Sequence, residues 1–303
     1  MSVIRTENLG KTYRGGKTAL ERLDLEVAAG EVFGFLGPNG AGKSTTIQLL
    51  LNLIRPTTGT AYLFDKPVTC AKIRQRVGYL PESVNLHAYY KGRRLIEFYA
   101  GLLGIKRADR SRSAMDVLAR VGLLDAADQA VSQYSKGMLQ RLGLAQALIN
   151  DPELLILDEP TSNLDPIARR DFRNIVLQSK ASGKTVFISS HILSEVESVC
   201  DRVAILQEGE MKRVGALEEL SRAKAFQIVV RDLPAAVMEW LATSKAQLTL
   251  RGGEATIECA DETLLREVEQ VLKKSGADIE RIETQMQSLE EIFFGAIDRQ
   301  EAP

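Results

Sequence analysis

Several kinds of residue and segment are scarce in this chain of 303 residues, and each scarcity narrows what the protein can be. The three cysteines, Cys70, Cys200 and Cys259, are odd in number and match no metal-binding spacing. We therefore expect buried free thiols in a reducing compartment. No uncharged apolar run approaches the ~18 residues that a membrane-spanning helix needs. The N-terminal MSVIRTENLGK also lacks the apolar core of a secretory signal, so we expect a cytoplasmic protein.

An excess of charge of either sign is also missing. The chain has 39 lysines and arginines against 40 acidic residues, a net charge of −1. Such a balance predicts neither a basic field for nucleic acid nor a polybasic patch for a membrane surface. Hydrophobic residues make up 45% of the chain and charged residues 26%, as in ordinary soluble globular proteins. The length favours two domains over a single core.

The most informative stretch is GPNGAGKST, which follows the apolar run Val32–Leu36 and fits the phosphate-binding spacing G-x-x-x-x-G-K-S. Glycines let successive backbone N–H groups turn inward onto phosphate oxygens, and a helix starting near Ser44 would direct its positive end at the same phosphates. Lys43 would reach the terminal phosphates, and the Ser44 hydroxyl would bind Mg²⁺. The residues expected at the nucleotide are Gly37, Pro38, Asn39, Gly40, Ala41, Gly42, Lys43, Ser44 and Thr45. The sequence therefore predicts that this chain binds a nucleoside triphosphate.

Two adjacent acids, Asp158 and Glu159, directly follow the apolar run Leu154–Leu157, which is typical of a parallel strand buried on both faces. In open α/β sheets ligands bind at the carboxyl ends of strands, so we expect both acids to face the phosphate loop. Asp158 would hold Mg²⁺, directly or through water. Glu159 would orient and deprotonate the attacking water. A pair of solvated acids at a strand end is the alternative.

Two further side chains are candidates for the same site. His191, one of only two histidines, follows the apolar strand Val186–Ile188 and could hold the γ-phosphate, the water and the base in line. The alternative for His191 is a structural histidine. Tyr13 lies in a glycine-rich link and could stack on an adenine face, or be a plain loop tyrosine. His87 has no such context, and we interpret it as a surface residue.

The order of the predicted elements indicates an α/β domain that contains a helical insertion. Short strands are expected at Val3–Asn8 and Val77–Leu80, among others, but strand signals vanish between Val84 and Gln146. Helical stripes appear there at Leu95, Phe98, Tyr99 and Leu102, and at Met115, Leu118 and Ala119. From about residue 221 the pattern indicates a small α+β domain. Its last helix opens with Ser288 and Glu291 in capping-box spacing.

Four motifs, GPNGAGKST, YSKGMLQR, LLILDEPTSNLDP and ISSH, in this order resemble those of the ATP-binding subunits of ABC transporters, over about residues 1–220. The YSKGMLQR variant and a C-terminal domain that contains SLEEIFF look most like the subset that partners separate membrane subunits in bacterial ABC-2-type exporters. The resemblance implies that Ser135 and Gly137 contact the γ-phosphate of ATP held by a second copy. The residues Asn163, Leu164 and Asp165 would form the loop that crosses the dimer interface.

The resemblance also implies that Pro81 and Glu82 form a lid coupled to the permease. Three positions depart from the common family pattern, because Glu82 stands where glutamine is usual, Lys136 where glycine is usual and Met138 where glutamine is usual. The last two look like a variant shared by the exporter subset. A glutamate at position 82 leaves open whether this position is a Mg²⁺ ligand.

We therefore expect an α/β fold: a P-loop ABC ATPase domain over residues 1–220, with a helical subdomain at about 84–146, and a small α+β accessory domain over 221–303. The expected function is hydrolysis of ATP, with Mg²⁺, to power transport, in the export direction, through integral-membrane permease subunits at the inner face of the cell membrane. A second copy of the chain would complete each ATP site, and no nucleic-acid partner is expected. The transported substrate cannot be read from this chain, because the permease would select it.

Two alternatives stay open: a soluble ABC-type ATPase acting on nucleic acid or ribosomes, and a regulatory ATPase of a membrane complex. The single phosphate loop and the short interval from Lys43 to Ser135, which leaves no room for a long coiled-coil arm, count against the first. The sequence does not separate the second from a transport subunit.

Overall fold

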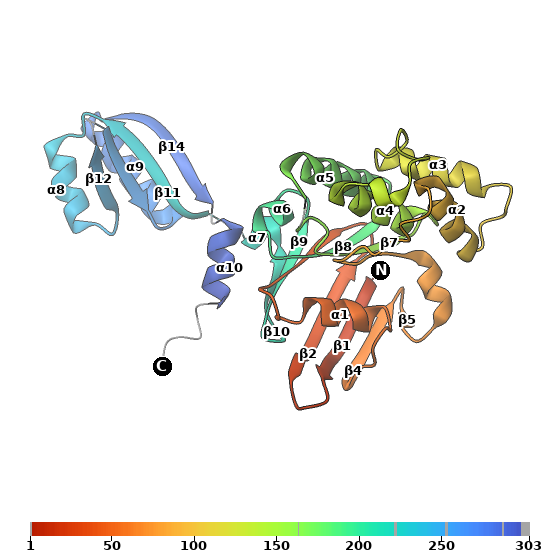
Figure 1. Cartoon of the computed structure of the whole chain (residues 1–303). Coiled ribbons are helices and arrows are strands. Elements are labelled where there is room, and N and C mark those ends of the chain that lie inside the picture. Colours follow the sequence, from red (N-terminus) through yellow and green to blue (C-terminus); the bar gives the residue numbers. More distant parts are fainter. Residues whose placement is uncertain (1, 163, 221–222, 252–253, 287, 298–303) are drawn as a thin grey trace. The chain divides into compact units, whose positions relative to one another are not determined.

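The computed structural model describes residues 2–162, 164–220, 223–251, 254–286 and 288–297 (Figure 1). The chain divides into two compact units, one covering the chain up to Leu217 together with Ala296 and Ile297, the other covering Glu218–Gly295. Each unit has its own hydrophobic core. That the second unit is an accessory to the first stays a prediction.

A six-stranded sheet in the order β10-β9-β3-β8-β7-β6 forms the centre of the first unit. Its strands are β3 (Val32–Leu36), β6 (Val77–Leu80), β7 (Leu154–Asp158), β8 (Thr185–Ser190), β9 (Arg202–Gln207) and β10 (Glu210–Ala216). All of the pairings are parallel except that of β10, which runs antiparallel to β9. Every residue of β3, β7 and β8 is buried, which explains their continuous apolar runs. The parallel order places the ends of β3, β7 and β8 at one edge, and this confirms the predicted α/β class.

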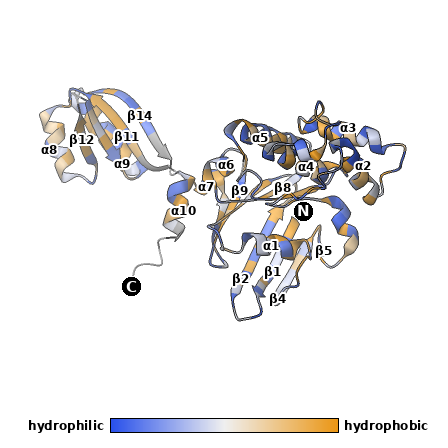
Figure 2. Ribbon diagram, viewed as in Figure 1, coloured by the Kyte–Doolittle hydropathy of each residue, from blue (hydrophilic) through white to orange (hydrophobic). Residues whose placement is uncertain are grey.

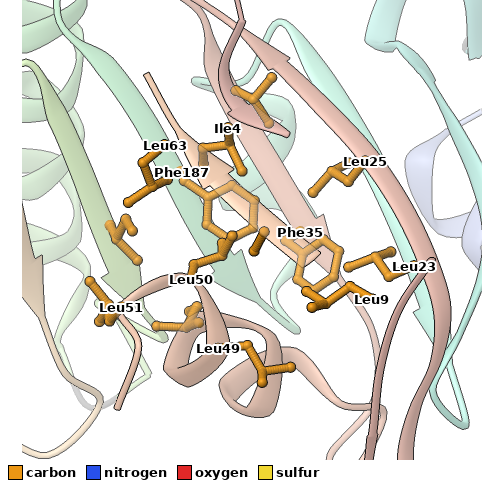
Figure 3. Packing of buried hydrophobic residues seen from close by; sticks show 14 of the residues in the cluster. Ile4, Leu9, Leu23, Leu25, Phe35, Leu49, Leu50, Leu51, Leu63 and Phe187 are labelled. Carbon is orange, nitrogen blue, oxygen red and sulfur yellow. The ribbon is translucent and has the colours of Figure 1, made fainter. Parts of the chain in front are cut away.

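A second, antiparallel sheet in the order β2-β1-β4-β5 packs against the first through a shared core. Its strands are β1 (Ser2–Thr12), β2 (Thr18–Ala28), β4 (Thr58–Leu63) and β5 (Lys66–Pro67). Figure 3 shows Phe35 and Phe187 from the central sheet among Ile4, Leu9, Leu23 and Leu63 from the outer sheet, with Leu49 and Leu50 of α1 (Lys43–Leu50) beside them. The rings of Phe35 and Phe187 lie 5.3 Å apart. This core fixes α1, and with it the phosphate loop, against both sheets.

The strand bounds correct two expectations. β1 extends to Thr12, well beyond the expected Val3–Asn8, because it pairs with β2 on one side and β4 on the other. β10 was not expected, because its pattern of half-buried residues carries little strand signal.

Three helices form the insertion between β6 and β7: α2 (Gly92–Leu102), α3 (Arg110–Arg120) and α4 (Lys136–Leu148). Between residues 84 and 146, all of which the structure describes, there is no strand, only an isolated bridge between Lys91 and Ala130. The predicted helical insertion is thus confirmed. The remaining helical segments of this unit are η1 (Ala71–Arg76), η2 (Val131–Gln133), α5 (Pro166–Ala181) and α6 (Leu193–Glu197). The short helix α7 (Leu217–Leu220) begins at the last residue of this stretch, and its other residues belong to the second unit.

The predicted buried stripes of the insertion are partly wrong. On α2 the buried residues are Gly92, Leu95, Ile96 and Ala100, whereas Phe98 and Leu102 are 50% and 69% exposed. On α3 they are Ala114, Val117 and Leu118, with Met115 half-buried and Ala119 exposed. Gly92 and Ala100 are small, so a count of bulky apolar side chains misses them. A Cβ at Gly92 would stand 2.2 Å from the Tyr134 hydroxyl oxygen, which lies outside the helices of the insertion. Figure 2 shows hydrophilic residues along much of α3 and α5.

The second unit is the predicted small α+β fold. An antiparallel sheet has the order β12-β13-β11-β14, with β11 (Ala223–Arg231), β12 (Gln247–Arg251), β13 (Glu254–Cys259) and β14 (Asp278–Met286). Helices α8 (Ala235–Thr243) and α9 (Glu262–Ser275) close its core, through Leu241, Val268 and Leu272 among others. In α10 (Leu289–Ile297) the Ser288 hydroxyl accepts from the Glu291 N–H at 3.2 Å, as the capping-box spacing predicts.

All three cysteines are free, as expected, but they differ in burial. Cys200 and Cys259 are buried, whereas Cys70 is half-buried. Burial raises the pKa of the Cys200 thiol, and it raises that of Cys259 to about 11, with nearby aspartates acting in the same direction. Because the thiolate is the reactive form, these two thiols should be inert.

One test of this packing concerns Gly78 in β6, on which α4 lies. A Cβ at this position would stand 2.1 Å from the Ala147 carbonyl oxygen and 2.8 Å from a Leu155 methyl group. Gly78→Ala should therefore lower the free energy of unfolding by about 1–3 kcal/mol, measured by urea denaturation. The matched control is Gly137→Ala at the start of α4, where the nearest atoms lie 3.8 Å away. If both variants unfold at the same urea concentration, the claim that α4 packs closely on β6 at Gly78 is wrong.

Candidate functional site

The phosphate loop links the end of β3 to the start of α1, and its glycines are required by its geometry. Gly40 and Gly42 have φ angles of +84° and +110°, in the left-handed region that glycine adopts without strain. A Cβ at Gly37 would stand 2.4 Å from the Leu206 carbonyl oxygen. Gly42 caps α1, which begins at Lys43, one residue before the expected start. Pro38, Asn39 and Gly40 are exposed at the rim of the loop, Ala41 and Gly42 are buried below it, and Ser44 and Thr45 are half-buried in the first turn of α1.

The Lys43 ammonium folds back into this loop. It donates to the carbonyl oxygens of Gly37 at 2.6 Å and of Pro38 at 3.2 Å. It also lies 3.1 Å from Oε1 of Glu159, an ion pair whose angle is not that of a hydrogen bond. Both side chains are more than 90% buried. Lys43 thus joins the phosphate loop to the acidic end of β7.

Asp158 is the last residue of β7, and its carboxylate lies beside the start of α1. Its Oδ1 accepts from the Ser189 hydroxyl at 2.6 Å and from the Ser44 hydroxyl at 3.3 Å. Burial raises the pKa of this carboxyl, and the charge of Glu159 acts in the same direction, although the two serine hydroxyls and Lys43 counteract them.

The oxygens of Ser44 and Asp158 are the hard donors that Mg²⁺ prefers. The described residues contain no group of three or more metal-binding side chains. The site therefore fits Mg²⁺ that takes its other ligands from phosphates and water.

Glu159 adopts an unusual backbone conformation with φ of +45°. Its N–H is bound by both the carbonyl oxygen and the hydroxyl of Ser189, each at 3.1 Å. A left-handed glutamate costs on the order of 1–3 kcal/mol, which the surrounding structure must offset. The result is a side chain held between Lys43 on one side and His191 on the other, with Nδ1 of His191 2.7 Å from Oε2. The structure thus brings together Glu159 and His191 from the ends of β7 and β8.

Tyr13 lies on the hairpin between β1 and β2, next to the phosphate loop. Its hydroxyl is 3.4 Å from that of Thr45, and its side chain is partly exposed at 39%. The Lys11 ammonium lies 5.4 Å from the ring centroid. A half-exposed ring in this place is available for stacking on a base, the role predicted from the sequence.

Ser135, Gly137 and Asp165 gather at a different place. Ser135 caps α4 by accepting the Met138 N–H at 3.2 Å, and Asp165 caps α5 by accepting the Ala168 N–H at 2.8 Å. A Cβ at Gly137 would lie 3.8 Å from the Ala168 methyl carbon, so the starts of the two helices are neighbours. Among the described residues, the side-chain hydrogen bonds of Ser135 and Asp165 are these local caps, and neither reaches the phosphate loop. The adjoining Asn163 lies outside the described residues.

Glu82 is exposed on the segment that follows β6. Burial, and then the charges of Asp158 and Glu82, raise the pKa of Tyr79 to about 12. Tyr79 therefore lies within electrostatic reach of both acids. Whether Glu82 is a metal ligand stays a prediction.

Sequence reasoning assigned no role to Ser189 or Tyr79. The signal for Ser189 was present in ISSH, because a serine at the buried end of an apolar strand needs a hydrogen-bond partner. It finds Asp158, which is also its neighbour across the strand register. No comparable signal marked Tyr79, which follows a glycine within a short apolar strand.

Comparison with known proteins bears on what this site does. The family model described as ABC transporter matches residues 20–162. The chain is 49% identical over 227 residues to an uncharacterized ABC transporter ATP-binding protein of Nostoc sp., covering 72% of this chain and 68% of that protein. It is 42% identical over 214 residues to the bacitracin transport ATP-binding protein BcrA of Bacillus licheniformis, and the match covers 69% of this chain and 68% of BcrA.

A solved structure with the same fold is that of the ATP-binding cassette MJ0796, described as a dimeric post-hydrolysis state bound to ADP and Pi. It has a TM-score of 0.65 and 27% identity, covering 71% of this chain and 98% of that one. The predicted family resemblance and the predicted fold are both confirmed by these comparisons.

The raised pKa of Asp158 generates a test with a definite sign. A carboxyl whose pKa is higher in the folded than in the unfolded chain destabilises the fold at pH values above both, and this cost disappears as the pH falls through the folded pKa. Asp158→Asn removes the buried charge but keeps an oxygen for Ser44 and Ser189. We expect the nucleotide-free variant to melt at a higher temperature than wild type at neutral and mildly alkaline pH, with the gain shrinking in acid.

The same variant should lose Mg²⁺-dependent hydrolysis of ATP. Asp116→Asn, an exposed aspartate on α3, is the control and should change neither property. Scanning calorimetry across pH measures the first effect and phosphate release the second. A lower melting temperature for Asp158→Asn at neutral pH would contradict the electrostatic argument.

Proposed function

This chain belongs to the family of ABC transporter ATP-binding proteins, and from that membership we propose that it powers export through separate membrane subunits, with hydrolysis carried out by the residues around Glu159. The protein is an ATPase of this family. The observation that carries the assignment of residues is the position of the Glu159 carboxylate, which lies between the ammonium of Lys43 and the ring of His191 at the mouth of the phosphate loop.

The phosphate loop and the first turn of α1 would bind the triphosphate through backbone N–H groups. The Lys43 ammonium would then leave the carbonyl oxygens of Gly37 and Pro38 and the carboxylate of Glu159, and would bind phosphate oxygens instead. Losing that partner leaves Glu159 free to accept a proton from water, while His191 holds it in place. Mg²⁺ held by Ser44 and Asp158 would neutralise phosphate charge. Tyr13 would cover the base.

A second copy of the chain would complete each site. Ser135 is exposed and Gly137 half-exposed, and among the residues that the structure describes no atom lies close enough to require glycine at position 137. A close approach by another molecule would supply that requirement. Asp165 caps the start of α5 beside them and would line the same interface. The dimeric state described for MJ0796 supports this proposal, and a symmetric pair needs only one kind of subunit.

The permease would dock at the segment from Glu82 to Tyr90, between β6 and α2. Tyr89 is fully exposed and Tyr90 half-exposed, and exposed aromatic side chains favour an interface. Within the described residues no helix has the length and apolar character to cross a membrane, so the pathway would belong to partner subunits. The name of one relative, a fluoroquinolones export ATP-binding protein of Mycobacterium tuberculosis that is 40% identical over 226 residues, supports export, and the proposed location is the inner face of the membrane. Co-purification from detergent-solubilised membranes, with identification of the bound subunits, tests this assignment; a nucleic-acid or ribosomal partner would overturn it.

Glu159→Gln tests the proposed base. The variant should bind ATP almost as wild type does, but hydrolysis should fall by ~10²–10⁴. It should also accumulate as an ATP-held dimer in size-exclusion chromatography, because reopening requires hydrolysis. The control is Glu153→Gln, just before the start of the same strand, where the carboxylate pairs with Arg76 on the surface. Steady-state hydrolysis by Glu159→Gln near that of wild type would remove Glu159 from this role.

Ser135→Arg tests the contribution of the second copy. A bulky cation at the start of α4 should block the partner's γ-phosphate from approaching, so hydrolysis should be lost. Affinity for a fluorescent ATP analogue should stay within about twofold of wild type, since Ser135 makes no described contact with its own phosphate loop. A large fall in affinity, with the fold intact by circular dichroism, would mean that Ser135 belongs to the nucleotide site of its own chain.

A further inference from the structure

A cleft of about 460 Å³ opens on the helical insertion, and none of the residues that line it is assigned to ATP. It lies between the exposed face of α2 and the start of α3. The residues that matter here are Arg93, Arg94, Arg107, Arg110, Glu97 and Phe98, all of which line it. Neither the nucleotide nor the proposed docking segment from Glu82 to Tyr90 uses this cleft.

The cleft is strongly basic although the whole chain is almost neutral. Residues 91–112 contain seven lysines and arginines against two acids, whereas the full sequence has a net charge of −1. The net charge gave no sign of this cluster, because a total over the chain says nothing about where the charges lie. Charge of one sign concentrated in a cleft attracts ligands of the opposite sign.

Internal partners neutralise only part of this charge. Arg94 pairs with Glu97 at 2.8 Å, and Arg93 pairs with Asp128 at 2.8 Å. Arg110 donates to the carbonyl oxygen of Ile105, which is neutral. Exposed Arg107 has no ion pair or hydrogen bond with any described residue. Among the described residues, Arg107 and Arg110 thus have no acidic partner to balance their charge, and guanidinium groups match the oxygens of a phosphate group.

Apolar side chains stand next to these arginines. Phe98 lines the cleft and is 50% exposed, and Leu102, one turn further along α2, is 69% exposed. A soluble phosphate compound would account for the arginines but not for the exposed ring and leucine. A bilayer surface accounts for both, because it offers anionic headgroups above an apolar layer in which such side chains can insert.

We infer that this surface, made by Arg93, Arg94, Arg107, Arg110, Phe98 and Leu102 and named here the α2–α3 surface, binds anionic phospholipid headgroups of the membrane. The inference does not depend on the transport function, since it concerns the chain and lipid alone. It gives the chain an affinity for the membrane that is independent of any permease. At an anionic membrane surface, each arginine raises the binding constant about fivefold.

The test uses the full chain and flotation with two kinds of vesicle, phosphatidylcholine alone and phosphatidylcholine with a third of the lipid as phosphatidylglycerol. We expect binding to the anionic vesicles only, weakening as salt rises. The double variant Arg94→Glu with Arg107→Glu should weaken it by at least ~25-fold. Lys66→Glu with Lys72→Glu, an equal change of charge at exposed positions elsewhere, is the matched control and should float as wild type does.

Two further arms separate the possible occupants. Phe98→Ser with Leu102→Ser should reduce flotation without changing its salt dependence, and neither double variant should alter ATP hydrolysis. Any of three results would overturn the proposed binding to anionic lipid: equal flotation with both kinds of vesicle, flotation that the arginine reversals do not change, or no flotation at all. If the chain does not float but binds inorganic polyphosphate through Arg94 and Arg107, the cleft takes soluble phosphate. If Arg94 and Arg107 are needed only to capture a permease, the surface belongs to that protein.

Discussion

The site depends on one buried contact, the ion pair between Lys43 and Glu159. Asp158 and Glu159 are adjacent, and both are more than 90% buried, an arrangement in which two like charges raise each other's energy. The Lys43 ammonium is the cation that offsets them, and it is itself held by two carbonyl oxygens of its own loop. Removing the lysine would leave two buried carboxylates without a counter-charge, and such uncompensated burial is strongly destabilising. The pair therefore has a structural role as well as a proposed catalytic one.

Sheet order explains how residues 43, 159 and 191 come to meet. β3, β8 and β7 are parallel neighbours, so the segments that leave their carboxyl ends emerge side by side. Ser189 then links two of these ends, because its hydroxyl and carbonyl bind Asp158 and the N–H of Glu159. The strained φ of Glu159 is tolerated where two hydrogen bonds and an ion pair fix it.

The sequence was sufficient for those features that depend on short-range spacing. The glycines of the phosphate loop, the acids after Leu157 and the histidine after β8 each follow a recognisable strand, and parallel strands end at a common edge. Contacts between residues far apart in the sequence were not accessible in this way, so the ion pair of Lys43 with Glu159 and the position of Tyr79 near Asp158 and Glu82 were missed. The exposure of Phe98 and Leu102 was also missed, because helical periodicity shows which side chains share a face of the helix but not whether another element packs on that face.

The arrangement also suggests why nucleotide binding and activation of the base would be coupled. While Lys43 is paired with Glu159, the ammonium lies against one oxygen of the carboxylate and occupies the space that a water molecule would need there. Phosphate oxygens carry more negative charge than one carboxylate, so they should compete successfully for the ammonium. Its departure would leave that carboxylate oxygen open to a water molecule only once a triphosphate is in place. His191, which is 44% exposed and contacts the other carboxylate oxygen, could keep the side chain in position during this exchange. A single lysine would thus restrict hydrolysis to the loaded site.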